Sequence, residues 1–191
     1  MLIQDKMIIF VRKYSKSFYL HRYMKKIGLL SDTHGFLDLR MLDFFENCDE
    51  IWHAGDIGNN GVSEQLSAFR PMKAVYGNMD DYDIRSQYPK FLRFFCEEVD
   101  VLMTHIGGYP GRYEPEALKM IKAGAPQLFL CGHSHILKVG HDAQYGLLHI
   151  NPGAAGNSGF HLVKTATRFI IDQKDIRELE ILELPRETTL K

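Results

Sequence analysis

Five short apolar runs, each followed directly by polar residues and glycine, constrain this chain more than any other feature. The runs are Ile27–Leu30, Glu50–Trp52, Lys73–Tyr76, Val101–Met103 and Leu128–Cys131. Short apolar runs bounded by turn residues are typical of buried strands. Because ligands of open α/β sheets bind outside the carboxyl ends of the strands, the sequence predicts one site assembled from these five strand ends.

The residues that follow the runs are imidazoles, carboxylates and one amide, namely Asp32, His34, Asp56, Asn78, His105, His133 and His135. Such donors suit divalent Mn, Fe, Ni or Zn without requiring a thiolate. Seven ligands are too many for one four-coordinate ion, and they indicate two ions that share a carboxylate. A single histidine after a strand is more often structural than a ligand. The specific signal is the conjunction of all five motifs in this order.

The remaining pattern predicts a mixed sheet with helices on its faces. Apolar spacing and punctuation indicate helices over residues 37–45, 62–69 and 115–123. Further strands are expected over residues 91–96 and 101–104, separated by an acidic turn at 97–100, and over residues 147–150, 167–171 and 176–182. We expect one domain over residues 24–185 and a short C-terminal tail over 186–191.

The charge of the chain is unevenly distributed. The total is −1, but residues 1–26 hold seven Lys or Arg residues and one Asp, so the other residues carry a net charge of −7. This acidic body argues against a broad nucleic-acid surface. The extension over residues 1–23 lacks the apolar segment and cleavage site of a signal peptide, and a transit peptide stays open. We expect a mis-assigned translation start, with Met24 as the true one.

The cysteines and the hydropathy pattern restrict the compartment. Cys48, Cys96 and Cys131 are odd in number and form no CxxC pair, which excludes a disulfide framework and favours the reducing cytoplasm. No apolar run approaches the roughly 20 residues that span a bilayer, so no membrane partner is expected. The sequence leaves a homo-oligomer open.

The motifs resemble those of the calcineurin-like metallophosphoesterases: Asp-x-His, Gly-Asp, Gly-Asn-x-Asp/Glu, a lone His, and Gly-His-x-His. Here they read Asp32-Thr33-His34, Gly55-Asp56, Gly77-Asn78-Met79-Asp80, His105 and Gly132-His133-Ser134-His135. The short chain looks like the small prokaryotic YfcE-type phosphodiesterases, over roughly residues 24–182. The resemblance implies an α/β fold, a four-layered α/β/β/α sandwich of two mixed sheets flanked by helices. The periodicity alone does not show this arrangement.

The resemblance also implies a role for each candidate ligand. Asp32, His34 and His135 would hold a first metal, Asn78, His105 and His133 a second, and Asp56 would bridge the two. The cofactors would be two divalent ions, Mn first, with Fe, Ni or Zn as alternatives. Two such ions can clamp a phosphate and activate a hydroxide that attacks phosphorus. The implied activity is hydrolysis of a small phosphodiester, with Asp56, Asn78 and His105 as the catalytic ligands.

The chain departs from the larger members of the family at one position. Many of them place a histidine, thought to protonate the leaving group, where this sequence has Met79. Met79 cannot donate a proton, which predicts slower turnover and a bias towards good leaving groups, and leaves Asp80 without that histidine to orient. The small subfamily commonly lacks the histidine. His53 could assist the bridging Asp56, but a structural role beside the site is the simpler interpretation.

Three further features have either a functional or a purely structural role. The glycine-rich segment 106–111 is either a substrate loop, with Tyr109, Arg112 and Tyr113 facing a ligand, or a plain connection to the next helix. Residues 151–154 resemble the family's Asn-Pro-Gly turn near the site. His141 and His149 are expected at the surface or beside the site.

Two other functions compete with hydrolysis of a small diester. One is a non-catalytic scaffold of the same fold, as in the eukaryotic retromer subunit, which departs from the metal pattern that is intact here. The other is a DNA nuclease, which the acidic body, the missing proton donor and the lack of a capping domain disfavour.

Overall fold

The structure is a computed structural model that describes residues 24–159 and 161–186. The expected extension over residues 1–23 and residues 187–191 of the expected tail lie outside the described residues. Within the described part, no helix is both long and apolar enough to cross a membrane.

The first sheet has five strands in the order β12-β11-β1-β2-β3. Its parallel centre consists of β1 (Lys25–Leu30), β2 (Glu50–His53) and β3 (Met72–Ala74). The long hairpin of β11 (Val163–Asp172) and β12 (Asp175–Pro185) extends it on the other side, with β11 antiparallel to β1. The three parallel strands therefore end at the same edge.

The second sheet repeats this plan in the order β4-β5-β8-β10-β9. Here β5 (Val99–Thr104), β8 (Leu128–Leu130) and β10 (Leu147–Pro152) are parallel. The antiparallel strands β4 (Phe91–Cys96) and β9 (Leu137–Asp142) form its two edges. A separate two-stranded ribbon joins β6 (Gly108–Tyr109) to β7 (Arg112–Tyr113).

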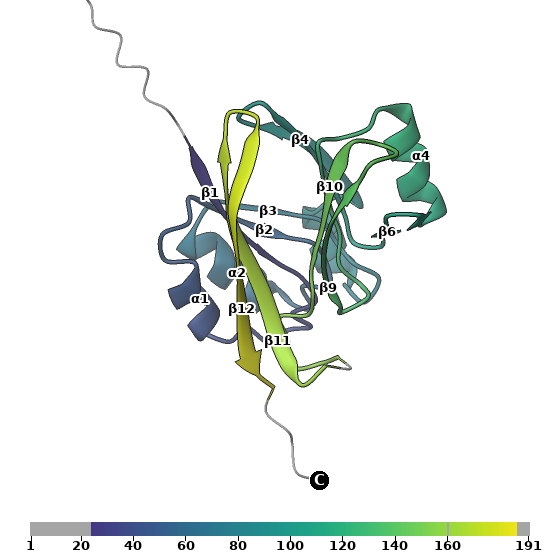
Figure 1. Cartoon of the computed structure of the whole chain (residues 1–191). Helices are drawn as coiled ribbons and strands as arrows, with labels where there is room; N and C mark the ends of the chain where they lie inside the picture. Colours follow the sequence, from purple (N-terminus) through teal and green to yellow (C-terminus); the bar gives the residue numbers. More distant parts are fainter. Residues whose placement is uncertain (1–23, 160, 187–191) are drawn as a thin grey trace, which may run out of the picture.

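The two five-stranded sheets pack face to face, and their facing side chains form the central core (Figure 1). Trp52 of β2 is fully buried there, with its ring 4.9 Å from the ring of Phe94 on the opposite sheet and 5.9 Å from that of Phe169 on its own. Both contacts are edge-to-face, the geometry that aromatic pairs prefer. Burial of alternate side chains from both sheets accounts for the double-sheet sandwich.

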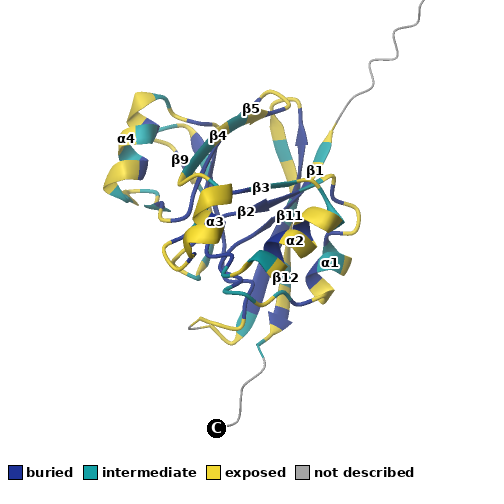
Figure 2. Cartoon of the chain, turned by 180° about the vertical axis from the view of Figure 1, so that it is seen from behind, coloured by how far each residue is buried: buried dark blue, intermediate teal, exposed yellow. Residues whose placement is uncertain are grey.

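Helices cover the outer faces of the sandwich. On the first sheet lie α1 (Arg40–Phe44), α2 (Asn60–Phe69) and α3 (Tyr82–Gln87), and on the second lies α4 (Pro115–Ala123), with their outward faces exposed (Figure 2). The predicted four-layered α/β/β/α sandwich of two mixed sheets flanked by helices is thus confirmed.

Several boundaries differ from the sequence prediction. The helix expected over residues 37–45 is reduced to α1, and the acidic turn at 97–100 is shorter, because Val99 and Asp100 already pair with β4. The sequence analysis missed α3, β9 and the β6–β7 ribbon. In the ribbon, Tyr113 packs against Phe129 and donates a 2.7 Å hydrogen bond to Asp142, so its hydroxyl already has a partner within the fold.

Candidate metal centre

The seven candidate ligands come from the carboxyl ends of five parallel strands, three in one sheet and two in the other. They follow β1 (Asp32 and His34), β2 (Asp56), β3 (Asn78), β5 (His105) and β8 (His133 and His135). Because the two sheets face each other, these ends meet at one edge of the sandwich. The structure therefore brings together the polar groups that the sequence analysis singled out.

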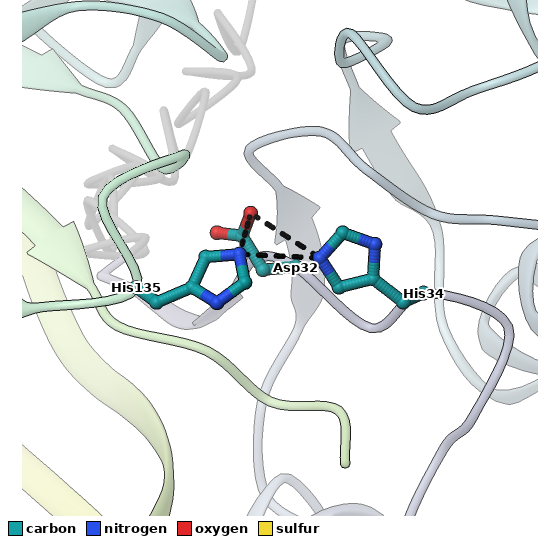
Figure 3. Close-up of side chains that lie close together, drawn as sticks. All are labelled: Asp32, His34 and His135. Carbon is teal, nitrogen blue, oxygen red and sulfur yellow. Dashed lines mark hydrogen bonds and ion pairs between the residues drawn. The ribbon is translucent and has the colours of Figure 1, made fainter. Parts of the chain in front are cut away.

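Asp32, His34 and His135 form the first compact group of donor atoms, drawn in Figure 3. Asp32 Oδ1 lies 3.1 Å from His135 Nε2 and 3.9 Å from His34 Nε2. The Nε2 atoms of the two histidines are 3.2 Å apart. The two rings approach from loops about a hundred residues apart in the chain and turn their Nε2 atoms towards the same carboxylate oxygen.

Asp32, Asp56 and His105 form a second group that shares Asp32 with the first. His105 Nε2 lies 3.2 Å from Asp56 Oδ2 and 3.8 Å from Asp32 Oδ1. The same Oδ2 atom of Asp56 is 3.9 Å from His34 Nε2. Both carboxylates thus lie between His34 on one side and His105 on the other.

Asn78 and His133 complete the set. Both line an open cavity of about 560 Å³ together with His34, Asp56 and His135. The ring of His133 lies 5.3 Å from that of His105, and its backbone N–H donates a 3.1 Å hydrogen bond to Asp32. Asp32 and His105 do not line this cavity, but Asp32 lies 3.1 Å from His135 and His105 lies 3.2 Å from Asp56, so both contact residues that do.

Three buried polar atoms of the centre have no hydrogen-bond partner within the described residues: Asp32 Oδ1, His105 Nε2 and His135 Nδ1. The first two belong to side chains that are almost completely buried. A buried polar atom without a partner is rare and calls for an explanation such as an ion. Oxygen and imidazole donors converging on one point suit a divalent cation of the first transition row. The residues present fit such a cofactor.

His105 and Asp56 shift each other's pKa because they lie in contact. Burial alone would lower the pKa of the His105 imidazole, but the Asp56 carboxylate 3.2 Å from its Nε2 and the charge of Asp32 raise that pKa above its ordinary value. Burial would raise the pKa of Asp56, but the neighbouring His105 lowers it. Burial lowers the pKa of His133. Since an imidazole binds a metal in its neutral form, a cation bound at His105 would compete with a proton there.

The backbone of the centre is strained at the ligands themselves. Five of the seven have a positive φ between 48° and 69°, the left-handed region that is uncommon for residues other than glycine: Asp32, His34, Asp56, His133 and His135. Such strain costs on the order of 1–3 kcal/mol per residue and persists only where the surroundings enforce it. Clusters of this kind occur at functional sites, and this one points the side chains of three separate loops towards one cavity.

Two glycines permit close approach between the ligand loops. A Cβ atom on Gly77 would lie 2.0 Å from Asp56 Oδ1, and one on Gly132 would lie 1.9 Å from the hydroxyl of Ser31. Both distances are far below van der Waals contact. Glycine at these two positions therefore lets the loops of the two sheets pack against the carboxylates.

Asp80 has a role that the sequence analysis missed. Its buried carboxylate accepts two 2.7 Å hydrogen bonds, from the backbone N–H groups of Gly58 and Gly77. These glycines belong to the loops that carry Asp56 and Asn78. The only sequence signal was the Gly-Asn-x-Asp motif, and it did not reveal that Asp80 joins two loops.

His53 has the structural role that was the simpler interpretation of the sequence. Its Nδ1 accepts the backbone N–H of Gly55 at 3.2 Å, so Nε2 carries the proton and donates to Thr33 Oγ1 at 2.9 Å. Thr33 in turn donates to the carbonyl of Ile57 at 2.9 Å. Burial lowers the pKa of His53 to about 4, which keeps the ring neutral. His53 connects the Asp32 and Asp56 loops and lies behind the cavity.

The segment that resembles the Asn-Pro-Gly turn supports the second histidine loop. The side-chain amide of Asn151 donates to the carbonyl of Gly132 at 2.8 Å and to the hydroxyl of Ser134 at 3.0 Å. Its carbonyl oxygen accepts the N–H of Gly153 at 2.9 Å. Asn151 thereby holds the loop of His133 and His135. Of the two further histidines considered above, His141 is exposed, and His149 is buried against Cys131.

Comparisons with known proteins agree with this geometry. The chain is 32% identical over 117 residues to a probable metallophosphoesterase of Methanothermobacter thermautotrophicus, a match covering 57% of this chain and 66% of that protein. It is 26% identical over 134 residues to a probable metallophosphoesterase of Methanocaldococcus jannaschii, covering 67% of each. The chain thus spans about two thirds of the length of these curated relatives.

Solved structures share the fold. A structure described as a novel archaeal phosphodiesterase superposes with a TM-score of 0.67 and 24% identity, over 83% of this chain and 99% of that one. Vps29 of Entamoeba histolytica, complexed with zinc, superposes with a TM-score of 0.65 and 14% identity, over 85% and 99%. The sequence family of the calcineurin-like phosphoesterase superfamily domain matches residues 24–174, and the chain belongs to that superfamily.

Proposed function

We propose that the protein is a phosphodiesterase that hydrolyses a small phosphodiester at a dinuclear metal centre. The observation that carries this proposal is the sharing of two buried carboxylates, Asp32 and Asp56, between imidazoles on opposite sides of the centre. A single ion would not need two carboxylates that each face imidazoles on both sides. The family membership supports a phosphoesterase, and the archaeal structural neighbour, which is described as a phosphodiesterase, supports the diester.

The ligand assignment follows from the two groups of donor atoms. Asp32, His34 and His135 would hold one ion, as their mutual distances favour. His105 would hold the other, together with Asn78 and His133, which line the same cavity or lie beside His105. Asp56 would bridge, because its Oδ2 atom faces both His34 and His105. Mn²⁺ is our first choice of ion, with Fe, Ni or Zn as alternatives.

Divalent ions bound here would supply Lewis-acid activation of water and would offset the charge on the phosphoryl oxygens. The protein's own residues hold the geometry for that chemistry. The backbone N–H of Met79 donates a 2.8 Å hydrogen bond to Asp56 Oδ1, which leaves Oδ2 directed into the centre. The backbone N–H of His133 donates a hydrogen bond to Asp32 Oδ2, which leaves Oδ1 of Asp32 directed into the centre.

The methionine at position 79 cannot protonate the departing oxygen. Met79 is 66% exposed and lines the cavity, and its thioether has no proton to donate to a leaving group. General acid catalysis contributes typically about 10²–10⁴-fold, so its absence favours esters of acidic alcohols such as nitrophenols. This supports a diester with a good leaving group as the test substrate.

A scaffold without catalytic activity is the alternative. The Vps29 likeness shows the fold alone, since its identity to this chain is 14%. The chemistry of the seven ligand positions supports the enzyme instead. The three cysteines are all buried and unpaired, which supports the proposed reducing cytoplasmic compartment.

The proposal is tested by hydrolysis of bis(4-nitrophenyl) phosphate. Protein stripped of metal should be inactive, and added Mn²⁺ should restore release of nitrophenol. Asp56→Asn should lose this activity, whereas Asp175→Asn, at an exposed site on the far hairpin, should retain it. Absence of metal-dependent hydrolysis in the unaltered chain, or full activity in Asp56→Asn, would refute the enzyme and leave the scaffold as the better account.

A further inference from the structure

A second cavity, of about 230 Å³, adjoins the metal centre on the side of Asn78 and His105. These two residues line it, and Asn78 also lines the larger cavity, so the two spaces lie next to each other. The other lining residues are Tyr76, Gly77, Arg85, Lys90, Thr104 and Ile106. The set contains two cations and no acidic side chain, in a chain whose body is otherwise acidic.

Arg85 is held rigidly at the wall of this cavity. Its Nε donates to the carbonyl of Asp80 at 2.7 Å, and its Nη2 donates to the carbonyl of Asn78 at 2.9 Å. The guanidinium carbon lies 5.2 Å from the centre of the Tyr76 ring. A guanidinium has five N–H donors, and these bonds use two of them. Arg85 thus fixes the backbone of a candidate ligand while keeping its charge at the cavity.

Lys90 supplies the second charge, and its backbone is fixed. The hydroxyl of Thr104 donates to the carbonyl of Lys90 at 3.1 Å, which ties Lys90 to the residue before His105. Its ammonium group pairs with Glu116 of α4, and this hydrogen bond raises the pKa of Lys90. The two side chains are 51% and 63% exposed. An exposed ion pair of this kind is weak, so the ammonium group can be shared with an arriving anion.

We propose that this cavity binds the second organic group of the substrate, and that it selects a planar group that carries an anion of its own, such as a carboxylate or a phosphate. The proposal rests on the proposed function, because the metal centre is what would hold the phosphoryl group. Tyr76 and Ile106 offer apolar contact to the planar group, and Lys90 and Arg85 offer charge to its anion. The preferred substrate is therefore a phosphodiester with at least one negative charge more than the diester itself.

The test compares two phosphonates that cannot be hydrolysed. Phenylphosphonate carries only the phosphoryl group and a ring, whereas 4-carboxyphenylphosphonate adds a carboxylate at the far end of the ring. Their affinities for the Mn²⁺-loaded full chain are measured by isothermal titration calorimetry. We expect the carboxylated compound to bind about fivefold more tightly, the upper range for an exposed ion pair.

Three variants test whether the preference for the carboxylated phosphonate arises from this cavity. Lys90→Met should weaken it, and Glu116→Gln should enlarge it, because Lys90 is then released from its partner. Lys119→Met, at an exposed position on the same helix as Glu116, should leave it unchanged. Equal affinities for the two phosphonates in the unaltered chain, no binding of either, or a preference of unchanged size in Lys90→Met would overturn the proposal.

The outcome is separable from that of the proposed function. Anion preference in the phosphonates without diester hydrolysis would sustain the cavity and refute the activity. Metal-dependent diester hydrolysis without that preference would sustain the activity and refute the role of the cavity.

Discussion

The carboxylate of Asp80 accepts a 2.7 Å hydrogen bond from the backbone N–H of Gly58, twenty-two residues earlier in the chain. Its other oxygen accepts the N–H of Gly77. One buried side chain therefore connects the loops that position Asp56 and Asn78. In members of the family with a histidine at the Met79 position, the acidic residue is expected to orient that histidine. Here it holds the two loops together.

Asp80→Asn should weaken both the fold and the metal centre. The amide replaces one acceptor oxygen by a donor, which leaves a buried N–H without a partner at a cost of about 1–3 kcal/mol. Loss of such support around ligands typically weakens metal affinity by about 10–100-fold. Urea unfolding and Mn²⁺ titration measure the two effects. Asp83→Asn, exposed on α3, serves as the control, and equal behaviour of the two variants would contradict the role of Asp80.

His53 should make the metal-free protein less stable as the pH falls from about 6.5 to 4. Its pKa is lowered from 6.5 to about 4 by burial, so the unfolded chain binds a proton in this range before the folded chain does. The free energy of unfolding therefore rises with pH across that window, by about 3 kcal/mol for this group.

Urea unfolding at several pH values measures this slope. His53→Gln should remove the contribution of His53, whereas His141→Gln, at an exposed histidine, should not. A slope that is identical in the unaltered chain and in His53→Gln would show that His53 is not a buried neutral residue.

Met79→His should change how the rate depends on the leaving group. The backbone N–H that bonds to Asp56 is kept, and the side chain is exposed at the cavity, so the fold should tolerate the change. A histidine there could donate a proton, with a gain of up to about 10²-fold for poorly leaving alcohols and little gain for nitrophenol.

The measurement is a series of aryl diesters whose leaving groups differ in pKa. Met79→His should flatten the dependence of kcat/KM on that pKa, and Met79→Gln, of similar length without an acidic proton, should not. An unchanged dependence in both variants would contradict the account of the missing proton donor.

The sequence predicted the elements that carry strong local signals. Strand β4 and helix α4 begin and end as expected, the helix because Pro115 suits its first turn and Gly124 its end. Helix α3 was missed because only Ile84 among its six residues is buried, which leaves no apolar periodicity. Strand β9 was missed because it is an edge strand whose side chains are mostly exposed.

The seven candidate ligands were found because their chemistry is visible in the sequence and their positions follow strands. The contacts that hold them could not be found in this way. The hydrogen bonds of Asp80, His53 and Asn151 join loops that are far apart in the chain. The left-handed backbone at Asp32 and His135 is uncommon for residues other than glycine, and the sequence alone does not show which residues adopt it.

The most direct test of the dinuclear centre is the number of Mn²⁺ ions that the metal-free chain binds in isothermal titration calorimetry. We predict two ions per chain, and fewer than two in Asp56→Asn, because the bridging carboxylate is lost. Asp175→Asn should still bind two. Binding of no ion by the unaltered chain, or of two with unchanged affinity by Asp56→Asn, would contradict the account.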